Sequence, residues 1–279
     1  MSTTLAPGAT PTAPSAPRGG SVTQARVARS EWTKLWSLRS TRWSLLAAVI
    51  SMAALPVGIA LVQMSRWSTM SLEDRSRYDA IDAGVGGYHL AQLAIGVLGV
   101  LVISGEYSTG MIRSSLMAAP KRLPVLWAKL GVFCGVTFVL MLVSTFVAFF
   151  AVQAIVAQHH VQRSLGDPHA LRAVIGAALF LTVLGALGVG LGALVRSTAG
   201  GIAAFVGLLF VLPGITALLP ATTGDAINPY LPLNAGFTVT TSTFEGPHHL
   251  STWGGFAVFC AYALVIVAAG AMRLARSDA

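Results

Sequence analysis

GEYSTGMIRSSLMAAPKRLPVLWAK, residues 105–129, is a polar and basic stretch between two long apolar runs. It begins with a carboxylate, Glu106, at the end of one run and finishes with Lys129 at the start of the next. A charged side chain inside a membrane is costly unless it is paired or faces water. The stretch therefore predicts two membrane-spanning helices joined by a polar connection on which another molecule can dock.

The composition of the whole chain supports a membrane protein. The 279 residues are 54% hydrophobic and only 10% charged, whereas a soluble globular protein carries about 25% charged residues. The apolar residues come in runs of roughly 20, the length that crosses a hydrocarbon core. We therefore expect an all-α membrane protein with six transmembrane helices, at residues 43–64, 83–104, 126–157, 171–195, 199–219 and 253–272.

The formal net charge of +8 could suggest nucleic acid as a partner, but the charges cluster at the ends of the apolar runs. Lys and Arg accumulate on the cytoplasmic side of membrane proteins. If the N-terminus is cytoplasmic, only five of the 18 lie outside, namely Arg66, Arg75, Arg77, Arg163 and Arg172. We therefore expect a multi-pass protein of the cell membrane with both termini in the cytoplasm, in contact with the lipid bilayer and not with nucleic acid.

The chain divides into a tail and one membrane domain. Residues 1–21 are rich in Pro, Ala, Thr and Gly, a composition that cannot bury a core. We expect a disordered cytoplasmic tail there, and a single transmembrane domain over residues 22–279.

Residues 22–40 predict an amphipathic helix that lies along the membrane surface, because Trp beside Lys and Arg is typical of interfacial helices. Projected at the helical period, the apolar stripe holds Ala25, Ala28, Trp32, Leu35 and Trp36, while Lys34 faces away. Arg39 falls on the apolar stripe, so we expect the helix to bend just before it. A basic flank that only sets orientation is the alternative.

Small residues one turn apart recur in two spans. Gly131 and Gly135 lie in the third, and Gly188 and Gly192, extended by Gly185, lie in the fourth. Such spacing lets helix backbones approach closely in lipid. Packing within the bundle and a contact between subunits both remain open.

The outer segment, residues 220–252, is too polar for a full span but contains short apolar pieces between Pro-containing breaks. Pieces of this kind can dip into the membrane and return where protein or water satisfies their backbone. We expect a re-entrant segment, with a folded surface loop as the alternative.

Within the opening stretch, Glu106 needs a partner at the membrane surface, and Arg113, Lys121 and Arg122 are candidates. Apolar pairs four residues apart predict a short helix over residues 107–117, ended by Pro120. A plain cytoplasmic loop is the alternative.

The order of residues is an acid, an aromatic, two small residues, Gly, a short helix, Ala-Pro-Lys-Arg, and a Lys at the next span. This resembles the membrane subunit of type-2 ABC transporters, in which the connection is the coupling helix. The upstream SEWTKLWSLRSTRWSLL, residues 30–46, is similar to the elbow helix of that family. Six spans and a re-entrant pair before the last one also match, so the resemblance covers the chain from about Ser30. Met111 departs from the Thr of many relatives, which leaves open the ATPase surface that it fits.

The resemblance implies a permease subunit that exports a lipophilic or amphipathic compound, driven by a separate ATPase (nucleotide-binding) subunit that binds ATP. Two permease subunits, identical or different, would pair. Carried over by position, the residues that contact the ATPase would be Glu106, Tyr107, Ser108, Thr109, Gly110, Met111, Ile112 and Arg113. The elbow would contain Trp32, Lys34, Leu35 and Trp36.

Motifs for catalysis are missing from the sequence. It has no phosphate-binding G-x-x-x-x-G-K-[ST] loop and no H-E-x-x-H or G-x-S-x-G motif. We therefore expect no enzyme activity in this chain alone, no cofactor and no metal. A membrane-anchored interaction or regulatory protein without transport is the alternative function. An intramembrane enzyme is less favoured, because no polar catalytic pair lies in the middle of a span.

Overall fold

The computed structural model describes residues 24–110, 122–242 and 250–276, and all regular structure within them is helical. In this part of the chain six helical segments are long and apolar enough to cross a membrane, which confirms the predicted fold class. They are α2 (Arg39–Ser65), α4 with α5 (Ala80–Val85 and Tyr88–Ser108), α7 (Arg122–Val156), α8 (Ala170–Val195), α9 to α10 (Thr198–Val206 and Leu212–Thr216) and α13 (Thr252–Arg276). The predicted tail, residues 1–21, lies outside the described residues.

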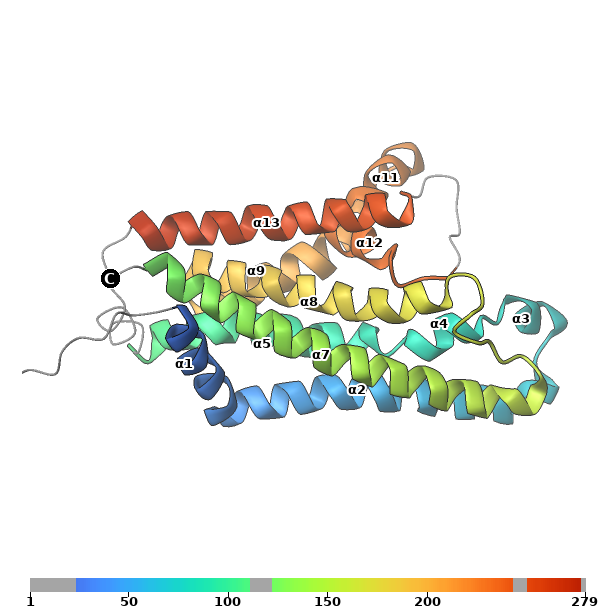
Figure 1. The fold of residues 1–279 in the computed structure, drawn as a ribbon. Helices are drawn as coiled ribbons and strands as arrows, with labels where there is room; N and C mark the ends of the chain where they lie inside the picture. Colours follow the sequence, from blue (N-terminus) through green and yellow to red (C-terminus); the bar gives the residue numbers. More distant parts are fainter. Residues whose placement is uncertain (1–23, 111–121, 243–249, 277–279) are drawn as a thin grey trace, which may run out of the picture.

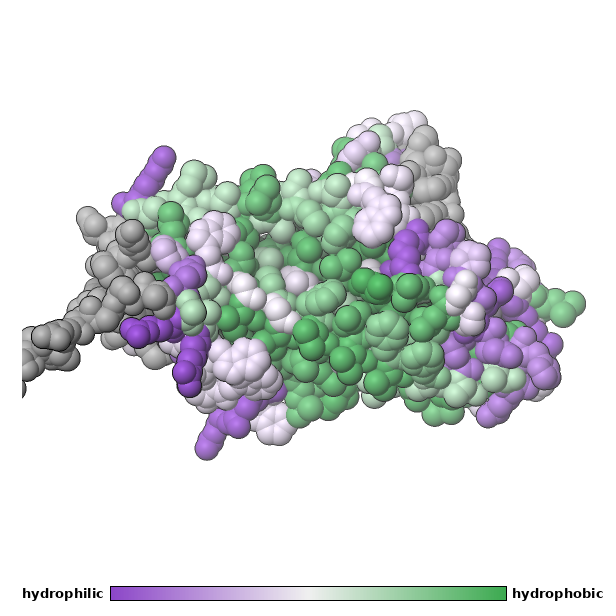
Figure 2. Space-filling model, in the orientation of Figure 1, coloured by the Kyte–Doolittle hydropathy of each residue, from purple (hydrophilic) through white to green (hydrophobic). Residues whose placement is uncertain are grey.

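The long helices run side by side in one bundle (Figure 1). The central one is α8, which packs against α5, α13 and α7. A broad hydrophobic band covers the middle of the visible face, and hydrophilic residues gather at both ends (Figure 2). We call the end with α1 (Gln24–Ser37) and the last turn of α5 the inner end, and the end with α3 (Leu72–Arg77) the outer end.

Helix α1 occupies the place of the predicted amphipathic helix, and the break before Arg39 is confirmed by the extended backbone of Leu38 (φ −81°, ψ 123°). The predicted stripe was partly wrong. The buried side of α1 consists of Val27, Glu31 and Leu35, whereas Trp32 is 51% exposed. In a membrane protein apolar side chains can face lipid as well as protein, so apolarity alone does not identify the packed face.

Glycines allow α5 and α8 to approach closely. A methyl group added at Gly188 would lie 2.5 Å from the carbonyl oxygen of Gly96, and one added at Gly99 would lie 2.4 Å from that of Gly185. The fourth-span motif therefore serves packing within the bundle. The third-span motif does not, because an added carbon at Gly131 would meet nothing within 4 Å.

The predicted outer segment contains two short helices, α11 (Ala221–Ile227) and α12 (Pro232–Phe237), joined by a 3-10 turn, η4 (Asn228–Tyr230). The side chain of Asn228 accepts a hydrogen bond from Thr216 at the end of α10 (3.0 Å). Helix α12 is largely buried and packs against α13. These contacts show a structured helical pair, and its dip into the membrane stays a prediction.

The remaining turns at the outer end are short. A 3-10 turn, η1 (Trp67–Thr69), follows α2, and another, η2 (Ala157–His159), continues α7. Away from the outer end, a π-helical turn, η3 (Gly207–Val211), lies within the fifth span and joins α9 to α10. With η2 included, the third span is 37 residues long, so α7 must tilt or extend beyond a bilayer core of about 30 Å.

Candidate functional site

The candidate site begins at the last turn of α5. The backbone N–H of Gly110 donates to the carbonyl oxygen of Tyr107 (3.2 Å), and Gly110 has a φ of +70°. Glycine adopts this left-handed conformation readily and commonly follows the end of a helix. The chain therefore turns away from α5 at Gly110. The predicted short helix and the predicted contact residues Met111, Ile112 and Arg113 lie outside the described residues.

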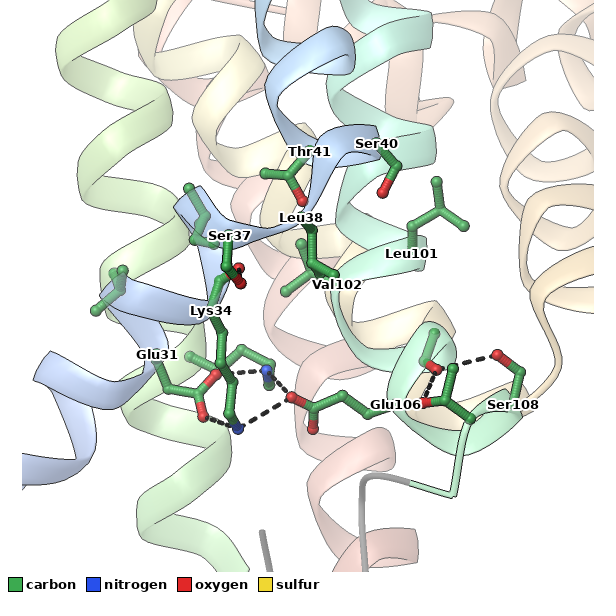
Figure 3. A pocket seen from close by; sticks show the side chains of 15 residues that line it. Glu31, Lys34, Ser37, Leu38, Ser40, Thr41, Leu101, Val102, Glu106 and Ser108 are labelled. Atoms are coloured by element: carbon green, nitrogen blue, oxygen red, sulfur yellow. Dashed lines mark hydrogen bonds and ion pairs between the residues drawn. The ribbon is translucent and has the colours of Figure 1, made fainter. Parts of the chain in front are cut away.

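Four charged side chains meet beside this turn (Figure 3). Nζ of Lys129 on α7 lies 2.5 Å from Oε2 of Glu31 and 2.8 Å from Oε1 of Glu106. Nζ of Lys34 lies 2.7 Å from Oε1 of Glu31 and 3.2 Å from Oε1 of Glu106. Two ammonium groups thus alternate with two carboxylates, and we call this the inner-end cluster.

Burial makes the inner-end cluster costly to break. Glu31, Glu106 and Lys129 are each about 5% exposed or less. Taking such charges out of water is unfavourable, and their mutual attraction offsets that cost only when every charge is well paired. The cluster therefore requires α1, α5 and α7 to meet at the inner end, since each helix contributes at least one charge.

The sequence had suggested Arg113, Lys121 or Arg122 as the partner of Glu106. The structure pairs Glu106 with Lys34 and Lys129, neither of which was among these candidates. The side chains of the three predicted partners are not among those described. Lys34 also does not face away from the packed side of α1 as predicted, because its ammonium group turns toward the two carboxylates.

The cluster changes the acidity of Lys34. Partial burial lowers the pKa of its ammonium group, but the hydrogen bond to Glu31 and the negative charges of Glu106 and Glu31 outweigh that effect. As a result the pKa of Lys34 lies above its ordinary value of 10.5. Lys34 is therefore a stable positive charge at physiological pH.

A second contact joins the end of α5 to the turn between α8 and α9. The guanidinium carbon of Arg196 lies 5.1 Å from the ring centroid of Tyr107, within cation–π range. Arg196 also donates to the backbone oxygen of Arg273 near the end of α13 (2.9 Å). The hydroxyls of Ser104 and Thr198 lie 3.2 Å apart in the same region. The last turn of α5 is therefore linked to both α8–α9 and α13.

The residues predicted to contact the ATPase differ in their exposure to solvent. Glu106 is buried and Tyr107 is partly buried, whereas Ser108, Thr109 and Gly110 are exposed. Of the predicted elbow residues, Leu35 is buried, Lys34 is partly buried, and Trp32 and Trp36 are exposed. The rings of the two tryptophans contact each other edge to face at 5.9 Å.

Glu31 and Arg196 were missed by the sequence reasoning. The sequence does contain a pattern that indicates Glu31, because an acid three residues before Lys34 on a helix is well placed to pair with it. It contains no such pattern for Arg196, since the contact of Arg196 with Tyr107 depends on how α5 and α8 pack. Within the described residues no group of three or more His, Cys, Asp or Glu side chains could hold a metal ion.

A family model described as ABC-2 family transporter protein matches residues 27–279, nearly the whole chain. No curated protein matches the chain. Members of the matched family are membrane subunits of transporters and are not themselves enzymes. The extent of the match and the six apolar helical segments agree, and the chain therefore belongs to the ABC-2 transporter family.

Proposed function

We propose that this chain is the membrane-spanning permease subunit of an ATP-binding cassette exporter of a lipophilic or amphipathic compound. A separate ATPase subunit binds and hydrolyses ATP, and a second permease subunit, identical or different, completes the membrane pathway. Family membership and the six apolar helical segments support a membrane subunit of this kind. The Lys and Arg distribution favours a cell-membrane protein with its inner end and both termini in the cytoplasm.

The coupling surface begins where the chain leaves α5. Ser108, Thr109 and Gly110 are exposed at the inner end, and the family resemblance implies that Met111, Ile112 and Arg113 also contact the ATPase. The observation that carries this proposal is the buried pairing of Glu106 with Lys34 and Lys129. Glu106 is too buried to contact the ATPase directly and acts by fixing the start of the surface to α1 and α7.

This arrangement gives a route for movement. A push on residues after Gly110 reaches the last turn of α5, which is joined through ion pairs to α1 and α7 and through Arg196 to the α8–α9 turn. Charges held in a buried network resist separation, so these elements move together as one body. The ATPase can therefore shift several membrane helices by contacting one short connection.

The test uses the chain assembled with its ATPase in lipid nanodiscs. In Glu106→Gln the side-chain shape is kept and the charge is removed, and Tyr107→Ala removes the contact with Arg196. In both variants we expect the rate of ATP hydrolysis per assembled complex to equal that of the ATPase subunit without the permease. Size-exclusion chromatography should show that the complex is still intact. Glu73→Gln is the matched control, because Glu73 pairs with Arg77 in the open, at 71% and 72% side-chain exposure.

If a complex with the Glu106→Gln/Tyr107→Ala double variant hydrolyses ATP as fast as the complex with the unmodified permease, the proposed role of these residues in coupling is contradicted. A membrane-anchored regulatory protein predicts a different outcome, namely ATPase binding without ATP-dependent movement of any compound. Uptake of a lipophilic dye into inverted vesicles, with and without ATP, distinguishes the two functions.

A further inference from the structure

A surface pocket of about 450 Å³ lies at the start of α2, at the inner end of the bundle (Figure 1). It is lined by Arg39, Arg42, Trp43 and Leu46, all of which are exposed. Their spacing of three, four and seven residues places them on one face of the helix. Ala48, on the opposite face, is fully buried. The pocket therefore opens on the side of α2 that faces away from the bundle.

The two guanidinium groups of this pocket carry positive charge that no described acid balances. The acids described at the inner end, Glu31 and Glu106, already pair with the two lysines of the inner-end cluster. Neither Arg39 nor Arg42 forms an ion pair or a side-chain hydrogen bond with another described residue. A guanidinium group can donate two parallel hydrogen bonds to a phosphate. Two such groups one helical turn apart are therefore suited to hold a phosphate.

The position of the arginines along α2 puts them at the depth of lipid phosphates. The helix has 27 residues and is about 40 Å long, whereas the hydrocarbon core of a bilayer is about 30 Å thick. The apolar sequence of α2 begins at Trp43, so the turn before it extends into the headgroup region. Trp43 is 69% exposed, and tryptophan is enriched at this boundary.

Farther along the same face, α2 presents an apolar surface. Leu46 and Ile50 are 44% and 53% exposed, and they lie about 6 Å and 12 Å beyond Arg42 along the helix axis. A molecule with a phosphate and a hydrocarbon chain can contact the arginines and these two side chains together. A free phosphate can contact the arginines only.

The net charge of the headgroup decides which phospholipid fits. In phosphatidylcholine a trimethylammonium group cancels the charge of the phosphate, and no acid is among the residues described as lining the pocket. In phosphatidylglycerol the phosphate keeps its full negative charge. Basic residues next to a transmembrane helix attract anionic lipids, so the pocket favours the second kind of headgroup.

We propose that this pocket binds an anionic phospholipid, with the lipid phosphate held between Arg39 and Arg42. The indole of Trp43 lies at the level of the glycerol backbone, and an acyl chain runs along Leu46 and Ile50. The bound lipid fixes the start of α2 at the membrane surface. The site goes beyond the proposed function, because its occupation needs neither an ATPase nor a transported compound.

Lipid preference is measured on the unmodified full chain in mild detergent. Native mass spectrometry follows the binding of the first lipid during titration with phosphatidylglycerol or with phosphatidylcholine of the same acyl chains. We expect phosphatidylglycerol to bind at least about tenfold more tightly, a factor that corresponds to about 1.4 kcal/mol. Equal affinity for the two lipids would overturn the proposal.

Paired arginine variants locate the site. In Arg39→Ala/Arg42→Ala we expect the affinity for phosphatidylglycerol to fall by about tenfold or more, with the affinity for phosphatidylcholine unchanged. Arg26→Ala/Arg29→Ala is the matched control. Arg26 and Arg29 have the same spacing and are exposed on α1, but they do not line the pocket. The control should weaken binding by less than about twofold.

An equal loss in the two double variants would show a general attraction of the basic end and would contradict a site at α2. Circular dichroism checks that both double variants keep the helix content of the unmodified chain. The lipid comparison on the unmodified chain uses no variant, so it tests the proposal even if a double variant fails to fold.

The water-soluble headgroup, glycerophosphoglycerol, shows whether the acyl chain takes part. We expect no displacement of phosphatidylglycerol when this headgroup is added in about tenfold excess, because it cannot contact Leu46 and Ile50. Displacement at equal concentrations would show a site for soluble phosphate esters and would overturn the assignment to a lipid.

Discussion

Nζ of Lys129 lies 2.8 Å from Oε1 of Glu106, although 23 positions separate the two residues in the chain. The last turn of α5 is therefore joined to α7, near the start of that helix, by a buried ion pair. Glu31 binds the same ammonium group at 2.5 Å, so α1 is held at the same point. Because these ion pairs hold α1, α5 and α7 together at the inner end, a displacement of the last turn of α5 is passed to all three helices.

Removal of Lys129 should destabilise the fold. Lys129→Met leaves two buried carboxylates with one ammonium group fewer, and we expect the free energy of unfolding to fall by about 3–5 kcal/mol. This free energy is measured by unfolding the protein in mixed micelles of a mild and a denaturing detergent and following the loss of helix by circular dichroism. Arg77→Met should change little, because Arg77 is 72% exposed and surface ion pairs contribute little.

A double-mutant cycle separates the ion pair from the loss of packing. Glu106→Leu combined with Lys129→Met removes both charges and leaves Glu31 paired with Lys34. We expect the double variant to be more stable than the sum of the single losses predicts, by about 0.5–3 kcal/mol. Strictly additive losses would show that the two residues are not coupled.

The raised pKa of Lys34 predicts where its contribution disappears. A folded-state pKa above 10.5 means that Lys34 stabilises the fold fully below pH 10.5, and that this stabilisation is lost as the pH rises through the folded-state value. The difference in unfolding free energy between the unmodified chain and Lys34→Met should be constant from neutral pH to about pH 10 and then shrink. The difference in unfolding free energy between Lys34→Arg and Lys34→Met should persist above pH 10, because the guanidinium group stays charged there. A free-energy difference that already shrinks near neutral pH would contradict a raised pKa for Lys34.

The glycine contacts predict opposite effects for two similar substitutions. Gly188→Ala places a carbon 2.5 Å from the carbonyl oxygen of Gly96, which forces α5 and α8 apart, and we expect a loss of about 1–3 kcal/mol. Gly135→Ala meets nothing within 4 Å and should be neutral or slightly stabilising, since alanine favours a helix. Unfolding in mixed micelles measures both. Equal losses would argue against close packing of α5 and α8.

At the outer end, the segment that follows α12 is held by two carboxylates. The backbone N–H of Ser242 donates to Oδ1 of Asp82 (2.7 Å), and its hydroxyl donates to Oδ2 of Asp79 (2.5 Å). In Asp82→Ala we expect the amide of Ser242 to exchange its hydrogen about tenfold faster or more, because a hydrogen bond to a charged group contributes about 1.5–3 kcal/mol. Asp74→Ala is the control, since Asp74 is exposed and its carboxylate accepts a hydrogen bond from the hydroxyl of Ser71 (2.6 Å), far along the chain from Ser242. Unchanged exchange at Ser242 would show that Asp82 does not hold this segment.

The spans were predictable because each is an apolar run of membrane-crossing length. The first expected span, residues 43–64, corresponds to α2 (Arg39–Ser65). The helix is longer than expected because residues 39–42 and 65 are polar or basic, and an apolar run does not include such residues even where the helix continues through them. The break before Arg39 was predictable for a related reason, since its charge interrupts the apolar stripe.

The packed face of α1 and the partner of Glu106 were not predictable in the same way. Lipid accepts apolar side chains, so the stripe that includes Trp32 did not identify the side that meets the protein, where Glu31 is buried. Lys34 is 72 positions from Glu106 in the chain, and only the packing of α1 against the bundle brings the two together. Local spacing had favoured nearer basic residues.

The central claim is that a separate ATPase docks where the chain leaves α5, and site-specific photo-crosslinking in living cells tests it most directly. A photoreactive amino acid replaces Ser108, which is exposed at the inner end, or Ser65, which is exposed at the outer end of α2, in cells that also make the candidate ATPase. We predict a crosslinked product with the ATPase from position 108 and none from position 65. Absence of the product at position 108 in an assembled complex, or its appearance only at position 65, would contradict the account.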